Sequence, residues 1–456
     1  MKNQIQKRIG FVCFGEVNTP YERLVLKHDG ALQALSGGVT GSIYDAGVVI
    51  DDPAYETADA AAAKLKEADA DCLIVCLAGW IPTHAVIRVT DPFRHLPMLL
   101  WGLSGWRERG KLITTAGQAG TAALRPAFEA MHYRFKYIYS IVGKPEPVDT
   151  IEAFTNAAYT ARFLRSARVG TMGYRDMLLY GTQFEGNSMR GKLGVEVEPF
   201  EMLEMVQNVK KLEPEKIKEG VAFVRGNWQF ERACDDAMIE TGVKYALAIG
   251  KKIEERGYQA VTLIDVDGMK KLLGFPPAMV FMLLEQYYGV LTVPENDIMG
   301  AVTQLIASGL TGQVAPYLEY YEFFEESMLV GVPDFIPKSA TEGDVRVQPT
   351  AFGLLSSSLL NISKVKTGVV TCLRLIYRDG AYSMHMYLAQ AKTPEPWEEC
   401  GWAHPAPQLP SLELAPMDCT VAEFAARVSS QHVILCYGDC RESVRDFCRL
   451  MDIELA

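Results

Sequence analysis

The segment Gly289-Val-Leu-Thr-Val-Pro-Glu-Asn-Asp-Ile-Met-Gly-Ala-Val-Thr-Gln-Leu-Ile-Ala-Ser-Gly309 joins an apolar run to a helical pattern through a short polar turn. The apolar run predicts a β-strand, and Asn296 or Asp297 is a suitable N-cap for the helix that follows. Apolar residues at helical spacing then predict one buried face, and Gly309 predicts the helix end. Glu295 is therefore expected at the carboxyl end of a strand, the edge where open parallel sheets bind ligands.

The same strand and helix alternation extends through the first two thirds of the chain. Strand-like runs occupy residues 8–14, 46–50, 72–77 and 98–101, with a helix-rich segment at 54–68 between them. A second α/β unit begins near residues 167–173, where a strand opens into a glycine turn. Such alternation predicts parallel sheets with crossover helices.

Beyond about residue 345 the pattern changes to β. Two strand-like runs, 367–377 and 381–388, flank Asp379-Gly380, a dipeptide typical of a β-hairpin turn. The Pro-rich passage 394–416 is interpreted as a connection. We therefore predict two open parallel-sheet α/β domains (1–165 and 166–345) and a β-rich, antiparallel, barrel-like C-terminal domain (346–456), with the functional site between the last two.

Composition limits the classes of function. The chain has 456 residues, of which 49% are hydrophobic and 22% charged, and its net charge is -11. This is a globular composition, and the negative charge argues against a broad nucleic-acid-binding face. No run approaches the roughly 20 apolar residues of a membrane span, and the run at 9–14 is too short for a signal peptide. The ten irregularly spaced cysteines predict reduced thiols. We expect a cytoplasmic protein with no membrane or nucleic-acid partner.

A second acid follows the first at a distance that suggests a shared site. Glu319 lies among aromatic residues in segment 314–324, 24 positions after Glu295. A strand, helix and strand of these lengths would bring both carboxylates to one sheet edge. The pattern alone also fits a structural interpretation, in which Glu295 stabilises the positive end of a helix and Glu319 is one exposed acid in an acidic stretch.

These segments resemble bacterial L-fucose isomerases, members of the L-fucose and L-arabinose isomerase superfamily. Glu295-Asn-Asp, the following helix and the aromatic-flanked Glu319 are similar to the family's metal-ligand segment. Ser430-Gln-His-Val-Ile-Leu-Cys-Tyr-Gly438, followed by a helix, resembles its C-terminal histidine segment. Gly170-Thr-Met-Gly-Tyr-Arg-Asp-Met177 and Leu77-Ala-Gly-Trp80 resemble the glycine loop of the second domain and the tryptophan loop.

The resemblance implies a divalent cation, usually manganese, bound by Glu295, Glu319 and His432. Oxygen ligands with one imidazole suit manganese. It also implies a metal-dependent aldose–ketose isomerase that acts on a free sugar of the L-fucose or D-arabinose kind through an enediol. The cation would stabilise the developing charge, and the two glutamates would act as general base and acid. Which glutamate is the base stays open.

The chain also departs from the family pattern. The second acid is Asp in typical fucose isomerases, and Glu319 is shared with arabinose isomerases. Arabinose isomerases add a ligand histidine soon afterwards, and here none lies between Glu319 and His385. Gln431 stands where the family has Asn, and no arginine lies near residues 14–18, where fucose isomerases carry one. The natural sugar is therefore open.

Four further residues are candidate substrate contacts: Trp80, Arg175, Gln431 and Trp402. By resemblance, Trp80 reaches the site of a neighbouring subunit in a trimeric or hexameric homo-oligomer, and its alternative is a buried aromatic at a strand end. Arg175 and Lys270 are either solvated or contact an acidic substituent on the sugar. His385 and His404 are weighed between packing and substrate contact.

Two other classes of function fit the sequence less well. The glycine-containing segments 14–20 and 114–120 have neither a GxGxxG nor a Walker pattern, which disfavours a nicotinamide-dependent dehydrogenase. A non-catalytic sugar-binding or regulatory protein on the same fold is the stronger alternative. Such a protein has no need of an acid, a base and a metal together.

Overall fold

The computed structural model describes residues 6–350, 358–395 and 409–456. The chain forms two compact units. The N-terminal unit comprises residues 3–162 with 442–450, and the larger unit comprises 163–441 with 451–456. The larger unit holds both a second parallel sheet and a barrel, and the domain boundaries predicted at residues 165 and 345 stay predictions.

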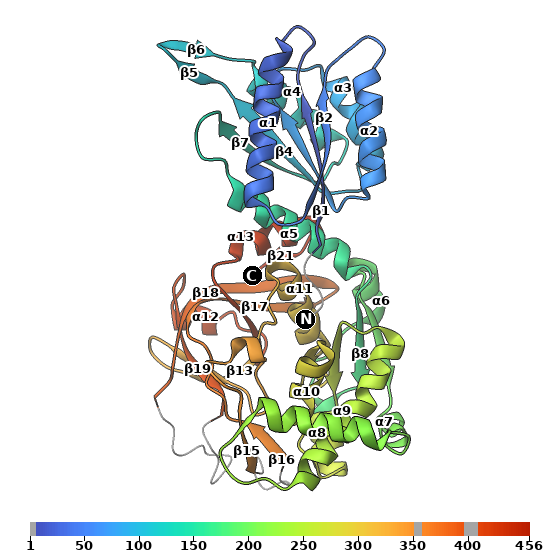
Figure 1. Ribbon diagram of the computed structural model, residues 1–456. Helices are drawn as coiled ribbons and strands as arrows, with labels where there is room; N and C mark the ends of the chain where they lie inside the picture. The colour runs from blue at the N-terminus through green and yellow to red at the C-terminus, as the bar shows by residue number, and fades with distance from the viewer. Residues whose placement is uncertain (1–5, 351–357, 396–408) are drawn as a thin grey trace. The chain divides into compact units, whose positions relative to one another are not determined.

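The N-terminal unit is an open parallel sheet of order β2-β1-β3-β4-β7, flanked by helices (Figure 1). Every residue of the central strand β3 is buried, which explains its continuous apolar sequence. The strands predicted at residues 8–14, 72–77 and 98–101 are confirmed. The strand predicted at residues 46–50 begins four residues earlier, at Ser42. The elements are β1 (Arg8–Phe14), α1 (Tyr21–Gly38), β2 (Ser42–Val49), α2 (Glu56–Ala68), β3 (Cys72–Leu77), α3 (Thr83–Thr90), β4 (Met98–Ser104), α4 (Gly117–Ala130), β7 (Phe135–Ile141), α5 (Val148–Leu164) and α13 (Arg441–Met451).

A four-stranded parallel sheet of order β12-β11-β8-β9 forms one layer of the larger unit. The bounds are β8 (Arg168–Met172), β9 (Glu196–Phe200), β11 (Ala260–Leu263) and β12 (Leu291–Val293). Helices α7 (Met202–Val209), α8 (Pro214–Asn227), α9 (Asp236–Arg256) and α10 (Ala278–Tyr288) belong to the same hydrophobic core as the sheet. The predicted second parallel sheet is confirmed.

Six antiparallel strands close into a barrel in the order β17-β20-β13-β14-β19-β18, since β17 and β18 also pair. The strands are β13 (Tyr317–Phe323), β14 (Met328–Gly331), β17 (Gly368–Arg378), β18 (Ala381–Lys392), β19 (Ser411–Pro416) and β20 (His432–Tyr437). Asp379 and Gly380 both have positive φ, as the predicted hairpin turn requires. The fold is thus mixed α/β with parallel sheets and a closed antiparallel barrel.

The barrel corrects two expectations. Strand β13, which carries Glu319, belongs to the barrel and not to the parallel sheet, so the predicted strand–helix–strand unit is wrong. On this strand Leu318 and Tyr320, two residues apart, pack in the barrel core, whereas Glu319 between them belongs to the other face. The C-terminal part of the passage interpreted as a connection is strand β19, while residues 396–408 lie outside the described residues.

Helix α11 (Ile298–Thr311) contacts the sheet strands β11 and β12 and the barrel strands β17 and β20. Its residues from Ile298 to Ala307 are all buried, so the helix is buried on every side and not only on the one face that was predicted. Asp297 is the N-cap, with its side chain accepting a hydrogen bond from Gly300, and the helix ends at Gly312 (φ 70°) instead of Gly309. This helix therefore places the residues before it between the sheet and the barrel.

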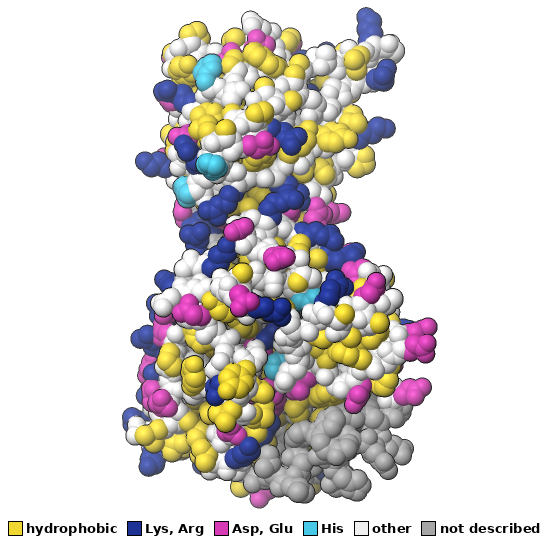
Figure 2. Space-filling view, turned by 180° about the vertical axis from the view of Figure 1, so that it is seen from behind, with side chains coloured by type: hydrophobic (Ala, Val, Ile, Leu, Met, Phe, Trp, Pro, Cys, Tyr) yellow, Lys and Arg dark blue, Asp and Glu magenta, His cyan; other side chains and the backbone are white. Residues whose placement is uncertain are grey.

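Other expectations concern the surface. Within the described ranges, no helix is long and apolar enough to cross a lipid bilayer. The cysteines of these ranges are free thiols, most of them buried. On the face drawn in Figure 2, acidic and basic side chains are interspersed among separate hydrophobic patches.

Candidate metal centre

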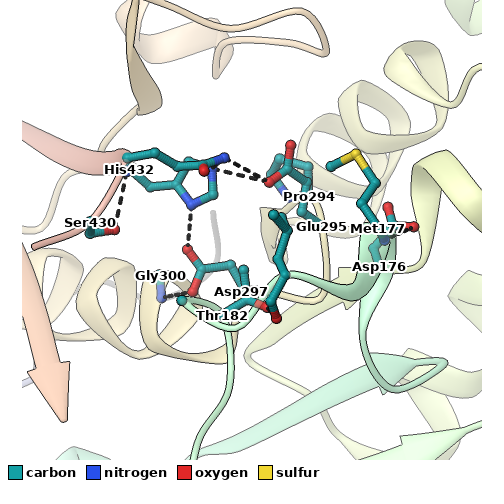
Figure 3. Close-up of polar contacts among 12 residues, drawn as sticks. Asp176, Met177, Thr182, Pro294, Glu295, Asp297, Gly300, Ser430 and His432 are labelled. Atoms are coloured by element: carbon teal, nitrogen blue, oxygen red, sulfur yellow. Dashed lines mark hydrogen bonds and ion pairs between the residues drawn. The ribbon is translucent and has the colours of Figure 1, made fainter. Parts of the chain in front are cut away.

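The structure brings together the three residues that the sequence predicted as metal ligands. Glu295, Glu319 and His432 each offer one ligand atom, and these atoms all lie within 4.8 Å of one another. Glu295 and His432 are buried and Glu319 is partly buried. Glu295 follows β12 of the parallel sheet, whereas Glu319 and His432 lie on the barrel strands β13 and β20. Figure 3 shows Glu295 beside His432.

The barrel ladder explains why Glu319 and His432 are neighbours. They are directly opposite each other in the antiparallel pair of β13 and β20. Their chain neighbours Leu318 and Val433 belong to the hydrophobic core of the barrel. Because side chains alternate along a strand, Glu319 and His432 point out of the barrel.

The predicted turn that carries Glu295 has a backbone conformation that the sequence did not indicate. Both Glu295 (φ 64°) and Asn296 (φ 51°) are left-handed, a conformation that is unfavourable for non-glycine residues and tends to occur at functional sites. The side-chain amide of Asn296 donates to the Thr171 hydroxyl and to the carbonyl of Met172, each at 2.9 Å. The turn between β12 and α11 is thus anchored to β8.

His432 is held between two carboxylates (Figure 3). Its Nε2 lies 3.1 Å from Oε2 of Glu295, and its Nδ1 lies 2.9 Å from Oδ2 of Asp297. Asp297 also accepts two hydrogen bonds from the guanidinium of Arg374 and one from the hydroxyl of Tyr317. A carboxylate on the far nitrogen is the usual partner of a metal-binding histidine. From the sequence, Asp297 was expected only to cap the helix, although its position two residues after a candidate ligand indicated that it could lie at the site.

Burial and charge shift the pKa values in this site. Burial alone lowers the pKa of His432, but its hydrogen bonds to Asp297 and Glu295 outweigh burial and raise that pKa to about 9. Burial and the charge of Glu295 raise the pKa of Glu319 to about 7. Although burial alone would raise the pKa of Asp297, Arg374 and His432 hold it well below its usual value. A cation would compete with a proton for His432 and relieve the repulsion between the two glutamates.

The donor set fits a divalent cation. Two carboxylates and one imidazole converge, and the interaction of Nδ1 with Asp297 directs Nε2 toward the carboxylates. Oxygen ligands with one nitrogen suit Mn²⁺ better than a metal that prefers thiolates.

A second charged cluster lies next to Glu295. Lys270 is buried, and its Nζ lies 3.3 Å from Oδ2 of Asp265 and 3.3 Å from Oδ1 of Asp334. Asp265 in turn accepts a hydrogen bond from the backbone N–H of Glu295. The expectation that Lys270 is solvated or free to bind an anion is therefore wrong, because two carboxylates already engage it. Neither aspartate was among the site residues predicted from the sequence.

The other predicted contacts differ in their positions. The side-chain amide of Gln431 lies 2.9 Å from Nε2 of His432 and 3.5 Å from Glu295, so Gln431 borders the cluster. The Arg175 guanidinium lies over the ring of Tyr180, in the loop after β8. His385 is buried and stacks on Phe424, which is in the barrel core, as its packing alternative predicted.

Two tryptophan predictions remain without a test. Trp80 follows β3 in the N-terminal unit and has 36% of its surface exposed, so it is not the buried aromatic of the alternative interpretation. Its role at the site of a neighbouring subunit, and the homo-oligomer itself, stay predictions. Trp402 and His404 lie outside the described residues.

Comparisons with known proteins give only remote likenesses. No protein-family model matches the chain, and no curated protein matches it. One similar solved structure is an ABC transporter solute-binding protein from Agrobacterium vitis with bound D-fucose, at 11% identity and a TM-score of 0.17, covering 63% of this chain and 93% of that chain. A second, from the same organism and with bound α-D-tagatopyranose, has 14% identity, a TM-score of 0.17 and the same coverage. Scores this low carry no conclusion about fold or function.

Proposed function

We propose that the chain is a divalent-cation-dependent aldose–ketose isomerase, with the cation bound by Glu295, Glu319 and His432. The observation that carries this proposal is the convergence of these three side chains, within 4.8 Å of one another, from separate parts of the sequence. A bound cation would stabilise the negative charge that develops on two adjacent sugar oxygens.

The chain's own residues would move the protons. Aldose–ketose conversion moves hydrogen from C2 to C1 and a proton from O2 to O1. One carboxylate removes the C2 proton and returns it to C1 of the enediol. Glu295 and Glu319 both converge on the proposed cation site, so either carboxylate is placed to accept and release a proton. The roles of Glu319 and Glu295 as base and acid remain interchangeable.

Charge pairing in the site favours a neutral sugar over an acidic one. Arg374 makes a two-point interaction with Asp297, and Lys270 is shared between Asp265 and Asp334. Both buried cations next to the cluster are thus already neutralised. An anionic substituent on the sugar would add to the excess negative charge.

The experiment is a turnover screen. The protein with Mn²⁺ is incubated in D₂O with a panel of neutral aldoses and the uronic acids that match them, and ketose formation and deuterium at carbon are followed by NMR. We expect turnover of a neutral aldose, with deuterium at C1 or C2, and none after chelation. Turnover of uronic acids alone would favour the anionic alternative. If Mn²⁺ binds but no sugar reacts or exchanges, the non-catalytic binding protein is the better description.

A further inference from the structure

Glu295 needs a backbone anchor that its own side chain cannot provide. Its φ of 64° is unfavourable for a glutamate, and its carboxylate is directed toward His432. The position of the next residue, Asn296, is fixed by hydrogen bonds from its side-chain amide to β8. The strain at Glu295 persists only if surrounding groups fix the turn.

Asp265 provides that anchor. Its Oδ1 accepts the backbone N–H of Glu295 at 2.6 Å, and Asp265 begins a helical segment after β11, the strand next to β12. A hydrogen bond from an N–H to a carboxylate is stronger than one to a neutral acceptor. The backbone position of Glu295 therefore depends on a side chain of the neighbouring strand's loop.

Lys270 offsets the free-energy cost of burying this carboxylate. Asp265 is fully buried, and an unpaired buried carboxylate is costly. The segment Asp265–Leu272 is a π-helix, in which residues five apart lie on similar sides, and its Lys270 reaches Oδ2 of Asp265 at 3.3 Å. The other oxygen of Asp265 is thereby left to hold Glu295.

We propose that Asp265, which is paired with Lys270, is a positioning residue that holds Glu295 in the geometry needed to bind the cation. The inference rests on the cation site proposed above and goes beyond it, because neither residue is a ligand. Lys270 acts through Asp265 and not as a contact for an anionic substrate.

The chain offers a matched control for the key hydrogen bond. Asp71, in the N-terminal unit, is also buried, and its Oδ2 accepts the backbone N–H of Arg8 on a neighbouring strand at 2.7 Å. Replacing Asp71 removes the same kind of hydrogen bond without touching the cation site. The comparison separates positioning of Glu295 from a general loss of stability.

The test measures Mn²⁺ affinity by EPR for the wild type, Asp265→Asn, Asp265→Ala, Asp71→Asn and Asp71→Ala, with thermal melting of each. Asn retains an acceptor oxygen but not the charge, so we expect affinity to fall in the order wild type, Asp265→Asn, Asp265→Ala. The alanine variant should bind about 10- to 100-fold more weakly than the wild type. Both Asp71 variants should melt earlier yet bind like the wild type.

The outcomes are distinguishable. Wild-type affinity in Asp265→Ala, or an equal loss in the Asp71 variants, overturns the positioning role while leaving the cation site intact. If Asp265→Ala does not fold, Asp265→Asn against Asp71→Asn decides in the same way. A wild type that binds no Mn²⁺ overturns the proposed function, and the positioning role with it.

Discussion

The Nδ1 atom of His432 lies 2.9 Å from Oδ2 of Asp297, so the carboxylate that caps helix α11 fixes an imidazole on barrel strand β20. This link orients the ring so that Nε2 lies next to Glu295. It joins the two layers of the larger unit at the candidate metal centre.

Replacing Asp297 should therefore weaken cation binding without removing a ligand. We expect Asp297→Asn to lower Mn²⁺ affinity about 10- to 100-fold, because the ring loses the carboxylate that orients it. Isothermal titration with Mn²⁺ measures this. Unchanged affinity in a folded variant would show that the link is structural only.

The pairing of Asp297 with Arg374 predicts a loss of stability that depends on whether one partner or both are removed. Arg374→Met leaves the buried Asp297 carboxylate without its main counter-charge and should cost about 3–5 kcal/mol in the free energy of unfolding. The double variant Asp297→Leu/Arg374→Met removes both charges and should lose less. Urea unfolding of the single and double variants measures these losses in the free energy of unfolding. A double variant that loses the sum of the single losses would contradict the prediction.

The fold was predictable where sequence pattern is local. The apolar runs of β1 and β3, the Asp379-Gly380 hairpin and the acid after β12 all follow from periodicity and turn chemistry. Strand β13 joins the barrel through a local hairpin with β14 and through β20, whose residues lie more than a hundred positions away. The hairpin was missed and the pairing with β20 is not visible in a local pattern, so the predicted route from Glu295 to Glu319 was wrong.

The ligand residues were predictable and their supporting residues were not. Glu295, Glu319 and His432 were identified through the resemblance, and the structure brings them together. The residues that support the ligands act through contacts that form only in the packed tertiary structure. They are Asp265, Asp297, Asp334 and Arg374. For the same reason Lys270 was misjudged as a surface cation.

Glu319 should be essential for proton transfer. Glu319→Gln keeps an oxygen near the cation but cannot exchange a proton, so we expect isomerase turnover to fall by about 10²- to 10⁴-fold. Glu322→Gln, an exposed acid on the same strand, is the matched control and should retain activity. Comparable turnover in Glu319→Gln and the wild type would remove Glu319 from the proton-transfer step.

Stability of the N-terminal unit should depend on pH through His28. Its hydrogen bond to Asp45 outweighs the effect of burial and, with Asp29, raises the pKa of His28 to about 9. Because this pKa exceeds the unfolded value of about 6.5, the stabilisation is complete below pH 6.5 and is lost as pH rises through 9.

We therefore expect the free energy of unfolding at pH 6 to be about 1 kcal/mol higher for the wild type than for His28→Gln. The value is modest because Asp29 is largely exposed and its charge is screened. The difference should shrink by pH 9.5. Unfolding by urea at the two pH values measures it, and a constant difference would exclude ionisation of His28 as the cause.

The most direct measurement for the whole account is Mn²⁺ binding followed by EPR in the wild type, His432→Ala and His132→Ala, the last being an exposed histidine of the N-terminal unit. The account predicts one tight Mn²⁺ per chain in the wild type and in His132→Ala, and loss of that site in His432→Ala with folding retained. A wild type without a tight Mn²⁺, or a His432→Ala variant that binds it equally well, would contradict the account.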